Sequence, residues 1–496
     1  SSAASDVYKR QAHAWIYEQY GFVPFRDSYR GFKHRWNRDS VYRDWLANGG
    51  GMASYLIDPD VFQAHLEKFH VKHGVNPRGI AASPAKLLYA LETMADAVES
   101  SARIGAYENA IEAGVDPRVA AYNSREISTD FARRGDSEVM AWLFDSIMFL
   151  NAAVQGIDRM YRGFTKDVNK QEIWLKTGAV ATISAILAAY WRNDEDYDKM
   201  EDWLKDGYWH FFVPGFNGQR VHIKLPKIWE IGAIASVAER SMLAMLKKLE
   251  GETSPEYVDN VVRIMIDQFK LDWVPFVAEP LYELAINRER YTDRPIITQG
   301  LKGMLPYAQY SAYTIRALVS RAEQAADFDP KWQMNPAKIE HLIRGFFNTF
   351  GMYGLMLADS MFAGDQLPAK KLGDYPGARV FIQSHPTRTK FDSEFWDLFE
   401  GFAEFHNTAI KMKNENKPAL LEQLAGKPEY QLYKILSSAH HDASRLSRQI
   451  SAIRLDPDMS REEKRDQIDE LSVKRQEIFQ MAVTEVNRAK EEMGVE

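Results

Sequence analysis

The stretch TGAVATISAILAAYW, residues 177–191, is the most apolar part of the chain and decides its fold class. It holds 15 uncharged residues between Lys176 and Arg192. A helix of that length spans roughly 22 Å at about 1.5 Å per residue, less than the roughly 30 Å hydrocarbon core of a bilayer. We therefore expect a buried central helix, mostly covered and packed against a helix at 140–164. Membrane insertion after a conformational change is the alternative.

Helical patterns continue on both sides of this stretch. Ser83 followed by Pro84 predicts the start of a long amphipathic helix that runs to Ile111 and ends at Gly114. Further helices are expected after Asp116-Pro117 and after Asn335-Pro336. Residues 288–294 and 364–386 read as loops.

The spacing of apolar residues changes once from the helical period to strict alternation. The alternation VHIKL at 221–225 follows an Asn217-Gly218 turn pair and is closed by Pro226, which predicts a β-hairpin at 209–225. The expected fold class is therefore all-α: a mostly helical, elongated multi-helix assembly with one small β-hairpin.

The length of 496 residues is too great for one hydrophobic core. We expect an aromatic and basic N-terminal arm with the start of the helical body at 12–82, a main helical domain with the hairpin at 83–330, a helical segment with a long loop at 331–415 and a C-terminal helical hairpin at 416–496. In that hairpin, Ser460 and Glu463 form a capping box that predicts where the second arm starts.

Residues 1–11 are set apart from this division. The run DVYKRQ at 6–11 resembles a translated transposon mosaic end of the kind used to prepare sequencing libraries. We expect residues 1–11 to be such an artefact, and the chain to be a fragment whose own beginning lies upstream. No signal-peptide pattern opens the chain.

Composition excludes several kinds of site. The chain has no cysteine, which excludes disulfides, thiolate zinc sites, iron–sulfur clusters and a cysteine nucleophile. The formal net charge of -7 gives no extended positive field for nucleic acid. Apolar residues make up 45% of the chain, enough to build a core.

The stretch 15–45 is aromatic and basic, and it interleaves Trp and Tyr with Arg and Lys from Trp15 to Trp45. Such a stretch can stack on bases or bind phosphates. The net charge favours the alternative, an irregular arm that packs on the body.

Candidate catalytic groups occur without a spacing that selects a reaction. His65, His70 and His73 lack the i, i+4 spacing of a zinc protease helix, and the adjacent His440 and His441 face apart. Neither a Walker sequence nor a Gly-x-Ser-x-Gly turn is present.

The pair Glu99-Ser100 is similar to the Glu-Ser pair of lytic transglycosylases, in which the acid protonates a glycosidic oxygen. The glycine-rich and glutamine-bearing motifs of those enzymes are missing. We expect Glu99 to be a surface residue of a helix, and we assign no catalytic, cofactor-binding or metal-binding residue.

Several short motifs resemble one family. They are SARIGAYE at 101–108, STDFARRG at 128–135, FLNAAVQG at 149–156, PLYE at 280–283 with Asn287, RPI at 294–296, NPAKIE at 335–340, the stretch 460–468, and the hairpin with Leu225-Pro226-Lys227. Together they are similar to the large polyvalent protein-associated domain numbered thirty-eight, from about Leu87 to the end. One departure is the DFA run at 130–132, where the family more often has Asn-Phe-Asn.

The resemblance implies a non-catalytic structural domain of a very large phage polyvalent or internal virion protein, located in the virion and delivered into the host with the DNA. It carries no catalytic residue with it and implies no cofactor. The partners it implies are other virion or ejection proteins, or further domains of the same long chain. Weak nucleic-acid contact, conditional membrane contact and oligomer formation are left open. The rival hypotheses are a cell-wall glycosidase with Glu99 as its acid, and a packaging protein that contacts nucleic acid through 15–45.

Overall fold

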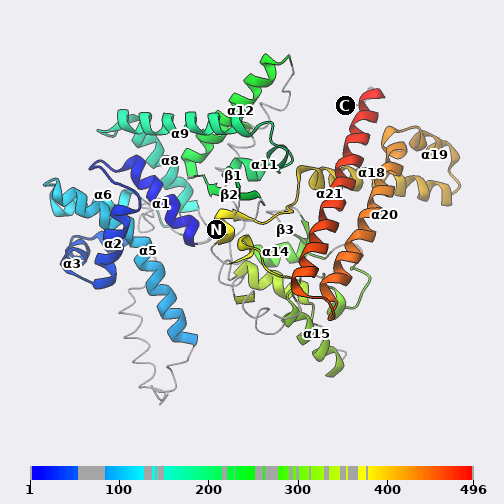
Figure 1. Cartoon of the computed structure of the whole chain (residues 1–496), viewed down its shortest axis with the longest axis horizontal. Helices are drawn as coiled ribbons and strands as arrows, with labels where there is room; N and C mark the ends of the chain where they lie inside the picture. Colours follow the sequence, from blue (N-terminus) through cyan, green and yellow to red (C-terminus); the bar gives the residue numbers. More distant parts are fainter. Residues whose placement is uncertain are drawn as a thin grey trace. The chain divides into compact units, whose positions relative to one another are not determined.

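The computed structural model describes most of the chain (Figure 1). The described residues are 3–53, 84–127, 137–139, 142, 150–214, 220–227, 229–251, 261–262, 278–289, 294–297, 301–311, 314–328, 334–346, 354–355, 367–375 and 378–493.

The chain divides into two compact units. Unit 1 is made of Ser1–Tyr190, Asp206–Trp209 and Leu225–Phe276, and unit 2 of Trp191–Lys205, His210–Lys224 and Val277–Glu496. Most described residues of both units lie in α-helices, so the expected all-α class with a small sheet is confirmed.

The helices of unit 1 follow the sequence patterns closely. They are α1 (Ala3–Tyr17), α2 (Arg26–Asn37), α3 (Ser40–Ala47), η1 (Gly50–Ala53), α5 (Pro84–Glu112), α6 (Pro117–Glu126), α8 (Leu150–Thr165), α9 (Lys170–Trp191) and α12 (Trp229–Leu249). The expected stop at Gly114 is confirmed by its φ of 80°. The expected start of α6 is confirmed by the carboxylate of Asp116, which accepts hydrogen bonds from the backbone N–H groups of Arg118 and Val119.

Helices α2 and α5 approach each other through two glycines. A Cβ atom placed on Gly31 would lie 1.9 Å from the carbonyl oxygen of Ser101, and one on Gly105 would lie 2.2 Å from the carbonyl oxygen of Asp27. Both positions therefore require glycine, because the two backbones meet directly.

Among the described residues, three small apolar clusters form the core of unit 1. One joins Trp45 of α3 to Ile104 and Tyr107 of α5. Another joins Ile16 of α1 to Ile173 of α9, Ile231 of α12 and their neighbours. The stretch 15–45, expected to be an irregular arm, is instead built largely of the helices α1, α2 and α3 and packs on α5. Apolar side chains at helical spacing gave α1 a face that its neighbours cover.

Residues 3–11, which were expected to belong to a translated artefact, form the first turns of α1. Gln11 is buried, and its side-chain oxygen accepts a hydrogen bond from the backbone N–H of Phe25 at 3.0 Å. These residues are therefore part of the folded unit, whatever the origin of their sequence.

The expected burial of residues 177–191 is wrong. The helix is longer than the apolar window, because α9 begins at Lys170, and one of its faces is exposed. Leu175 is 74% exposed and Ile183 is 65% exposed, whereas Ile173 and Ser184 on the opposite face are buried. The contact of α9 with α8 is at their connection, where the rings of Phe164 and Trp174 meet at 4.6 Å.

The described elements of unit 2 are mostly short before the C-terminal helices. They are α10 (Glu195–Asp198), α11 (Asp202–Gly207), α14 (Glu279–Ile286), β3 (Arg288–Glu289), β4 (Arg294–Pro295), η3 (Pro306–Ala308), α15 (Arg316–Phe328), η5 (Leu372–Asp374), α17 (Ala378–Phe381), β5 (Ile382–Gln383), α18 (Lys390–Asn414), α19 (Pro418–Ala425), α20 (Pro428–Leu455) and α21 (Arg461–Glu492). The helix expected after Asn335-Pro336 is confirmed at 336–346.

The expected β-hairpin is confirmed and gains a third strand. Strands β1 (Tyr208–Pro214) and β2 (Arg220–Pro226) form it, and β5 pairs antiparallel with β2, with His222 opposite Gln383. The Asn217-Gly218 turn lies outside the described residues. The stretch 364–386, expected to be a loop, thus contains η5, α17 and β5 in its described part.

The prediction of a loop at 288–294 is also partly wrong. Strands β3 and β4 pair antiparallel, with Arg288 opposite Pro295 and Glu289 opposite Arg294. Asn287 precedes β3 in a left-handed conformation with a φ of 55°, and its side chain binds the backbone of Ile297 through both its oxygen and its nitrogen. This asparagine closes the short hairpin.

The core of the C-terminal region is formed by α18, α20 and α21. Phe395 of α18, Leu436 of α20 and Val483 of α21 are all fully buried in one cluster. The expected helical hairpin is present as α20 and α21, and the predicted cap is confirmed: the Ser460 hydroxyl accepts a hydrogen bond from the N–H of Glu463 at 3.2 Å. The hairpin therefore packs with α18 as a three-helix core.

Candidate functional site

The residues weighed from the sequence do not form a site in the described structure. His65, His70 and His73 lie outside the described residues, as does the side chain of Glu99, whose backbone is in α5. His440 stacks on the ring of Phe399 at 4.6 Å, and this partial burial lowers its pKa. His441 is exposed at the surface of α20.

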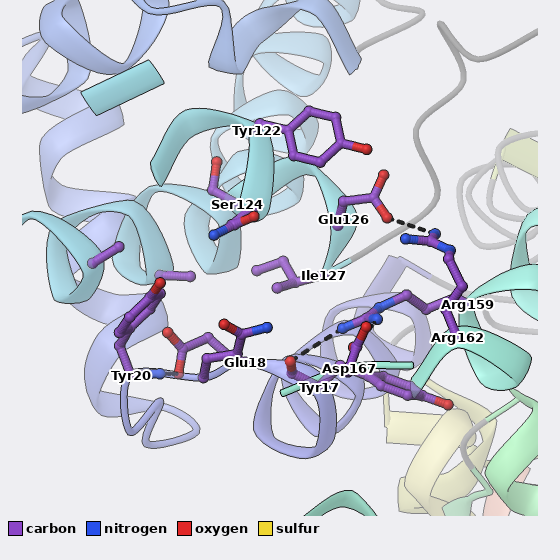
Figure 2. Close-up of a pocket in the computed structure, with 14 residues that line it drawn as sticks. Tyr17, Glu18, Tyr20, Tyr122, Ser124, Glu126, Ile127, Arg159, Arg162 and Asp167 are labelled. Atoms are coloured by element: carbon purple, nitrogen blue, oxygen red, sulfur yellow. Dashed lines mark hydrogen bonds and ion pairs between the residues drawn. The ribbon is translucent and has the colours of Figure 1, made fainter. Parts of the chain in front are cut away.

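Unit 1 contains a small polar cavity of about 90 Å³ (Figure 2). Its wall is formed by the end of α1, by α5 and α6, and by α8 with the turn that follows it. Two tyrosines of the aromatic stretch, Tyr17 and Tyr20, line it. At roughly 10–15 Å³ of such space per water, the cavity has room for several water molecules or one very small ligand.

The arginines of this cavity are bound to acids of the same cavity. Arg162 donates to Glu126 at 2.7 Å, and Arg159 donates to Asp167 and to the carbonyl oxygen of Tyr17 (Figure 2). Arg159 also lies over the ring of Tyr17. Because each guanidinium already has a carboxylate, the cavity offers no spare cation to an anionic ligand.

Glu18 is an acid of this cavity with unused bonding capacity. Its Oε2 accepts hydrogen bonds from the backbone N–H groups of Tyr20 and Phe22, and its buried Oε1 has no hydrogen-bond partner among the residues that the structure describes. Burial raises the pKa of this carboxyl group. The neighbouring hydroxyl of Ser124 donates to the carbonyl of Ala121 and accepts from Trp45, so it is not placed as a nucleophile.

Unit 2 contains a larger cavity of about 490 Å³. Its charged lining residues are the acids Glu195, Asp196, Asp469 and Glu477 and the cations Lys199, Arg220, Lys371 and Arg388. The volume falls within the usual range for small-molecule sites, and the lining mixes polar and apolar surface in similar parts, with eight charged side chains among the lining residues.

The cations of this cavity are also paired. Arg220 binds Asp194 and Asp196, and Lys371 binds Asp469. Lys199 binds Glu195 at 2.6 Å, and Arg388 lies 3.4 Å from Glu201. These ion pairs connect α10, β2, η5 and α21, so they hold the wall of the cavity together.

A chain of three histidines reaches the same cavity. Nδ1 of His210 in β1 lies 2.9 Å from Nε2 of His222 in β2, and Nδ1 of His222 lies 3.1 Å from Nε2 of His385. His210 and His222 are buried, and His385 lines the cavity. Burial, followed by the neighbouring imidazoles, lowers the pKa of His222.

The backbone fixes the direction of the protons along this chain. Nε2 of His210 lies 3.0 Å from the carbonyl oxygen of Leu204, which can only accept, so that nitrogen carries a proton. In neutral rings Nε2 of His222 then donates to His210, and Nε2 of His385 donates to His222. The three hydrogen-bonded histidines therefore form an ordered structural link between α11, β1, β2 and the residues after β5.

Among the residues that the structure describes, no group of three or more His, Asp or Glu side chains is placed to hold a metal ion. The three imidazoles face one another nitrogen to nitrogen, which leaves no common point for an ion between them.

The sequence held little signal for this cluster. His210 and His222 are 12 residues apart, and His385 follows 163 residues after His222. No local spacing rule joins them, because the pairing of β2 with β5 brings them together. The alternation in β2 was visible, yet His222 is buried while Val221 and Ile223 are half-buried.

Comparison with known proteins gives one match. The family described as large polyvalent protein associated domain 38 matches residues 194–378. No curated protein matches the chain, and no solved structure does.

The match includes the motifs at 225–227, 280–283, 294–296 and 335–340 and the sheet strands β1 and β2. The similar stretches at 101–108, 128–135, 149–156 and 460–468 lie outside it. Over residues 194–378, which are less than half of the chain, the sequence therefore matches the family model of large polyvalent protein associated domain 38, and this match associates it with large polyvalent phage proteins.

Proposed function

We propose that this chain is a non-catalytic, structural part of a large phage polyvalent protein that is packaged in the virion and delivered into the host cell with the DNA. The observation that carries the proposal is the pairing of charges in both cavities. The arginines and lysines that line them hold helices and strands to one another.

Two further features support a structural role. The elements around the larger cavity belong to the matched domain or pack beside it, so the domain's polar side chains serve its own architecture. In the stretch 15–45, Arg26 binds Asp27 at 2.7 Å and Arg30 lies 3.3 Å from Glu108, which takes up cations that a nucleic-acid site would present.

Mass spectrometry of purified particles tests the location. In particles of a phage that encodes this chain, purified by two successive density gradients, we expect its peptides at a constant ratio to the major capsid protein. Peptides found in the infected-cell lysate and missing from purified particles would contradict the proposal.

A cell-wall assay tests the rival enzyme. The purified chain and its Glu99→Gln variant are incubated with peptidoglycan, and released muropeptides are measured by chromatography. We expect no release with either protein. Release by the original chain that is lost in Glu99→Gln would establish the glycosidase instead.

A further inference from the structure

The larger cavity, in unit 2, contains acceptor groups that its own ion pairs do not use. Each lysine and arginine of its lining has a carboxylate partner. Glu477 of α21 also lines the cavity, and its exposed carboxylate has no hydrogen-bond or ion-pair partner among the residues that the structure describes. The lining therefore has one carboxylate more than its cations neutralise.

One side of α21 brings this carboxylate to the cavity. The lining residues of the helix are Asp469, Val473, Gln476, Glu477 and Gln480. Their spacing places them along a single side of the helix, with each neighbour one turn or less from the next. Val473 is 43% exposed, so this side presents an apolar surface next to the carboxylate.

His385 supplies a second acceptor to the same cavity. Its Nε2 donates to Nδ1 of His222 at 3.1 Å, because the carbonyl oxygen of Leu204 fixes the direction of the protons along the three histidines. Burial lowers the pKa of His385, so its ring is neutral at pH 7. A neutral imidazole with a proton on Nε2 keeps a lone pair on Nδ1. That nitrogen has no hydrogen-bond partner among the described residues, so a molecule in the cavity can donate to it.

The walls that carry these two acceptors are tied to each other. The side chain of Gln476 donates to the carbonyl oxygen of Thr387, which joins α21 to the residues that follow β5. Nζ of Lys371 donates to the carbonyl oxygen of His385 at 2.5 Å and also binds Asp469 of α21. Because these contacts order the walls before a ligand enters, binding costs less conformational entropy.

The unused groups select the chemistry of a ligand. A carboxylate and an unprotonated imidazole nitrogen both accept hydrogen bonds, so they favour a donor and disfavour an anion. A primary ammonium group combines positive charge with three N–H donors. A metal ion fits less well, because no three ligand side chains converge within the part of the chain that the structure describes. The volume of about 490 Å³ leaves room for an aliphatic body beside Val473.

We propose that the larger cavity binds a small aliphatic primary amine, with Glu477 binding its ammonium group and Nδ1 of His385 accepting a hydrogen bond from it. The charge of Glu477 selects a cation, and the lone pair of His385 selects a cation that has N–H groups. This inference goes beyond the proposed structural role and does not depend on it.

Calorimetric titration of the full chain with 1,4-diaminobutane tests the site. This probe has an ammonium group at each end, so it reaches two acceptors at a range of separations. We expect binding at pH 7.5 in low salt, with a dissociation constant of the order of 1 mM because the ligand is small. The analogue in which methyl groups replace all N–H hydrogens keeps both charges and should bind about tenfold more weakly. This comparison does not depend on how any variant folds.

Substitutions on α21 locate the site. Glu477→Gln should weaken the binding of 1,4-diaminobutane about tenfold, and Glu477→Lys should abolish it, since a lysine would repel the ammonium group. Glu477 is exposed, so neither change removes a buried contact. The matched controls are Glu485→Gln and Glu485→Lys, which make the same charge changes at an exposed residue of α21 outside the cavity lining. Both controls should bind like the original chain.

Four results would overturn the proposal. They are no binding of 1,4-diaminobutane to the original chain, equal binding of its fully methylated analogue, unchanged binding by Glu477→Gln, and retained binding by Glu477→Lys. Equal losses in the variants at 477 and at 485 would also overturn it, because they would show a general effect of net charge instead of a site.

Discussion

Lys227 shows how unit 1 accommodates a buried charge. Its side chain is 2% exposed, and its Nζ lies 2.6 Å from Oε2 of Glu239 and 2.9 Å from the hydroxyl of Ser236. Burial lowers the pKa of Lys227 and raises the pKa of Glu239 to about 7, so desolvation works against both charges. The pair therefore contributes less to stability than its short distance suggests.

Replacing one partner of this pair should cost more than replacing both. Lys227→Met leaves Glu239 buried without its cation, and we expect the free energy of unfolding to fall by about 3–5 kcal/mol. Lys227→Met with Glu239→Leu should recover most of that loss. Urea unfolding of the two variants measures the difference; a double variant as unstable as the single one would show that the pair itself is strongly stabilising.

His13 gives a prediction about pH. It is buried on α1, its Nδ1 lies 2.7 Å from the carbonyl of Ile127, and burial lowers its pKa to about 4. The unfolded chain therefore binds a proton at His13 below about pH 6.5 while the folded chain stays neutral until about pH 4. Stability is complete above pH 6.5 and is lost as the pH falls through that window.

We expect His13 to account for about 2 kcal/mol of lost stability between pH 7 and pH 5. His13→Asn keeps a donor for the carbonyl of Ile127 and cannot titrate, so it should lose that much less over the same interval. Urea unfolding at the two pH values is the measurement. An identical pH dependence in both proteins would show that His13 is not the group responsible.

The contacts of single residues were the hardest feature to predict from the sequence. The three imidazoles at 210, 222 and 385 are joined by strand pairing across a long separation, and no local pattern encodes that contact. Ser460 was predicted correctly because an N-cap depends on residues within one turn. What the sequence shows reliably about a residue is therefore what its immediate neighbours determine.

At the scale of elements, the crossing of α2 and α5 makes a direct test of backbone packing. Gly31→Ala would place a Cβ against the backbone of Ser101, so the helices must separate, and we expect a loss of about 3 kcal/mol in the free energy of unfolding. The control is Gly178→Ala at an exposed position of α9, where no atom lies within 4 Å of the added Cβ.

In an exposed helix interior alanine is more favourable than glycine, so Gly178→Ala should stabilise by about 0.5–1 kcal/mol. Thermal and urea unfolding of the two variants compare them. Equal effects of the two substitutions would contradict the close approach of α2 and α5.

Element type was more predictable than element environment. The apolar window at 177–191 correctly indicated a helix, but Lys170, Glu172 and Lys176 extend α9 beyond the uncharged run, and hydropathy does not say which face other elements cover. The two-residue strand β5 was missed because Ile382-Gln383 has no pattern of its own and exists through its pairing with β2.

For the whole molecule, composition and periodicity gave the all-α class, and short motifs gave the family. The family match confirms the resemblance over 194–378. The division into units was beyond the sequence, since unit 1 and unit 2 each combine three separate stretches of the chain. Contacts between distant stretches carry no local signature that periodicity can detect.

We propose that this chain travels with the phage DNA. The most direct test of this proposal is to infect cells in which protein synthesis is blocked with chloramphenicol, remove attached particles, and measure peptides of the chain in the host interior by mass spectrometry. We expect these peptides to enter together with the DNA, because a protein packaged in the virion was made in the previous infection. Peptides that stay with the removed particles while the DNA enters would contradict it.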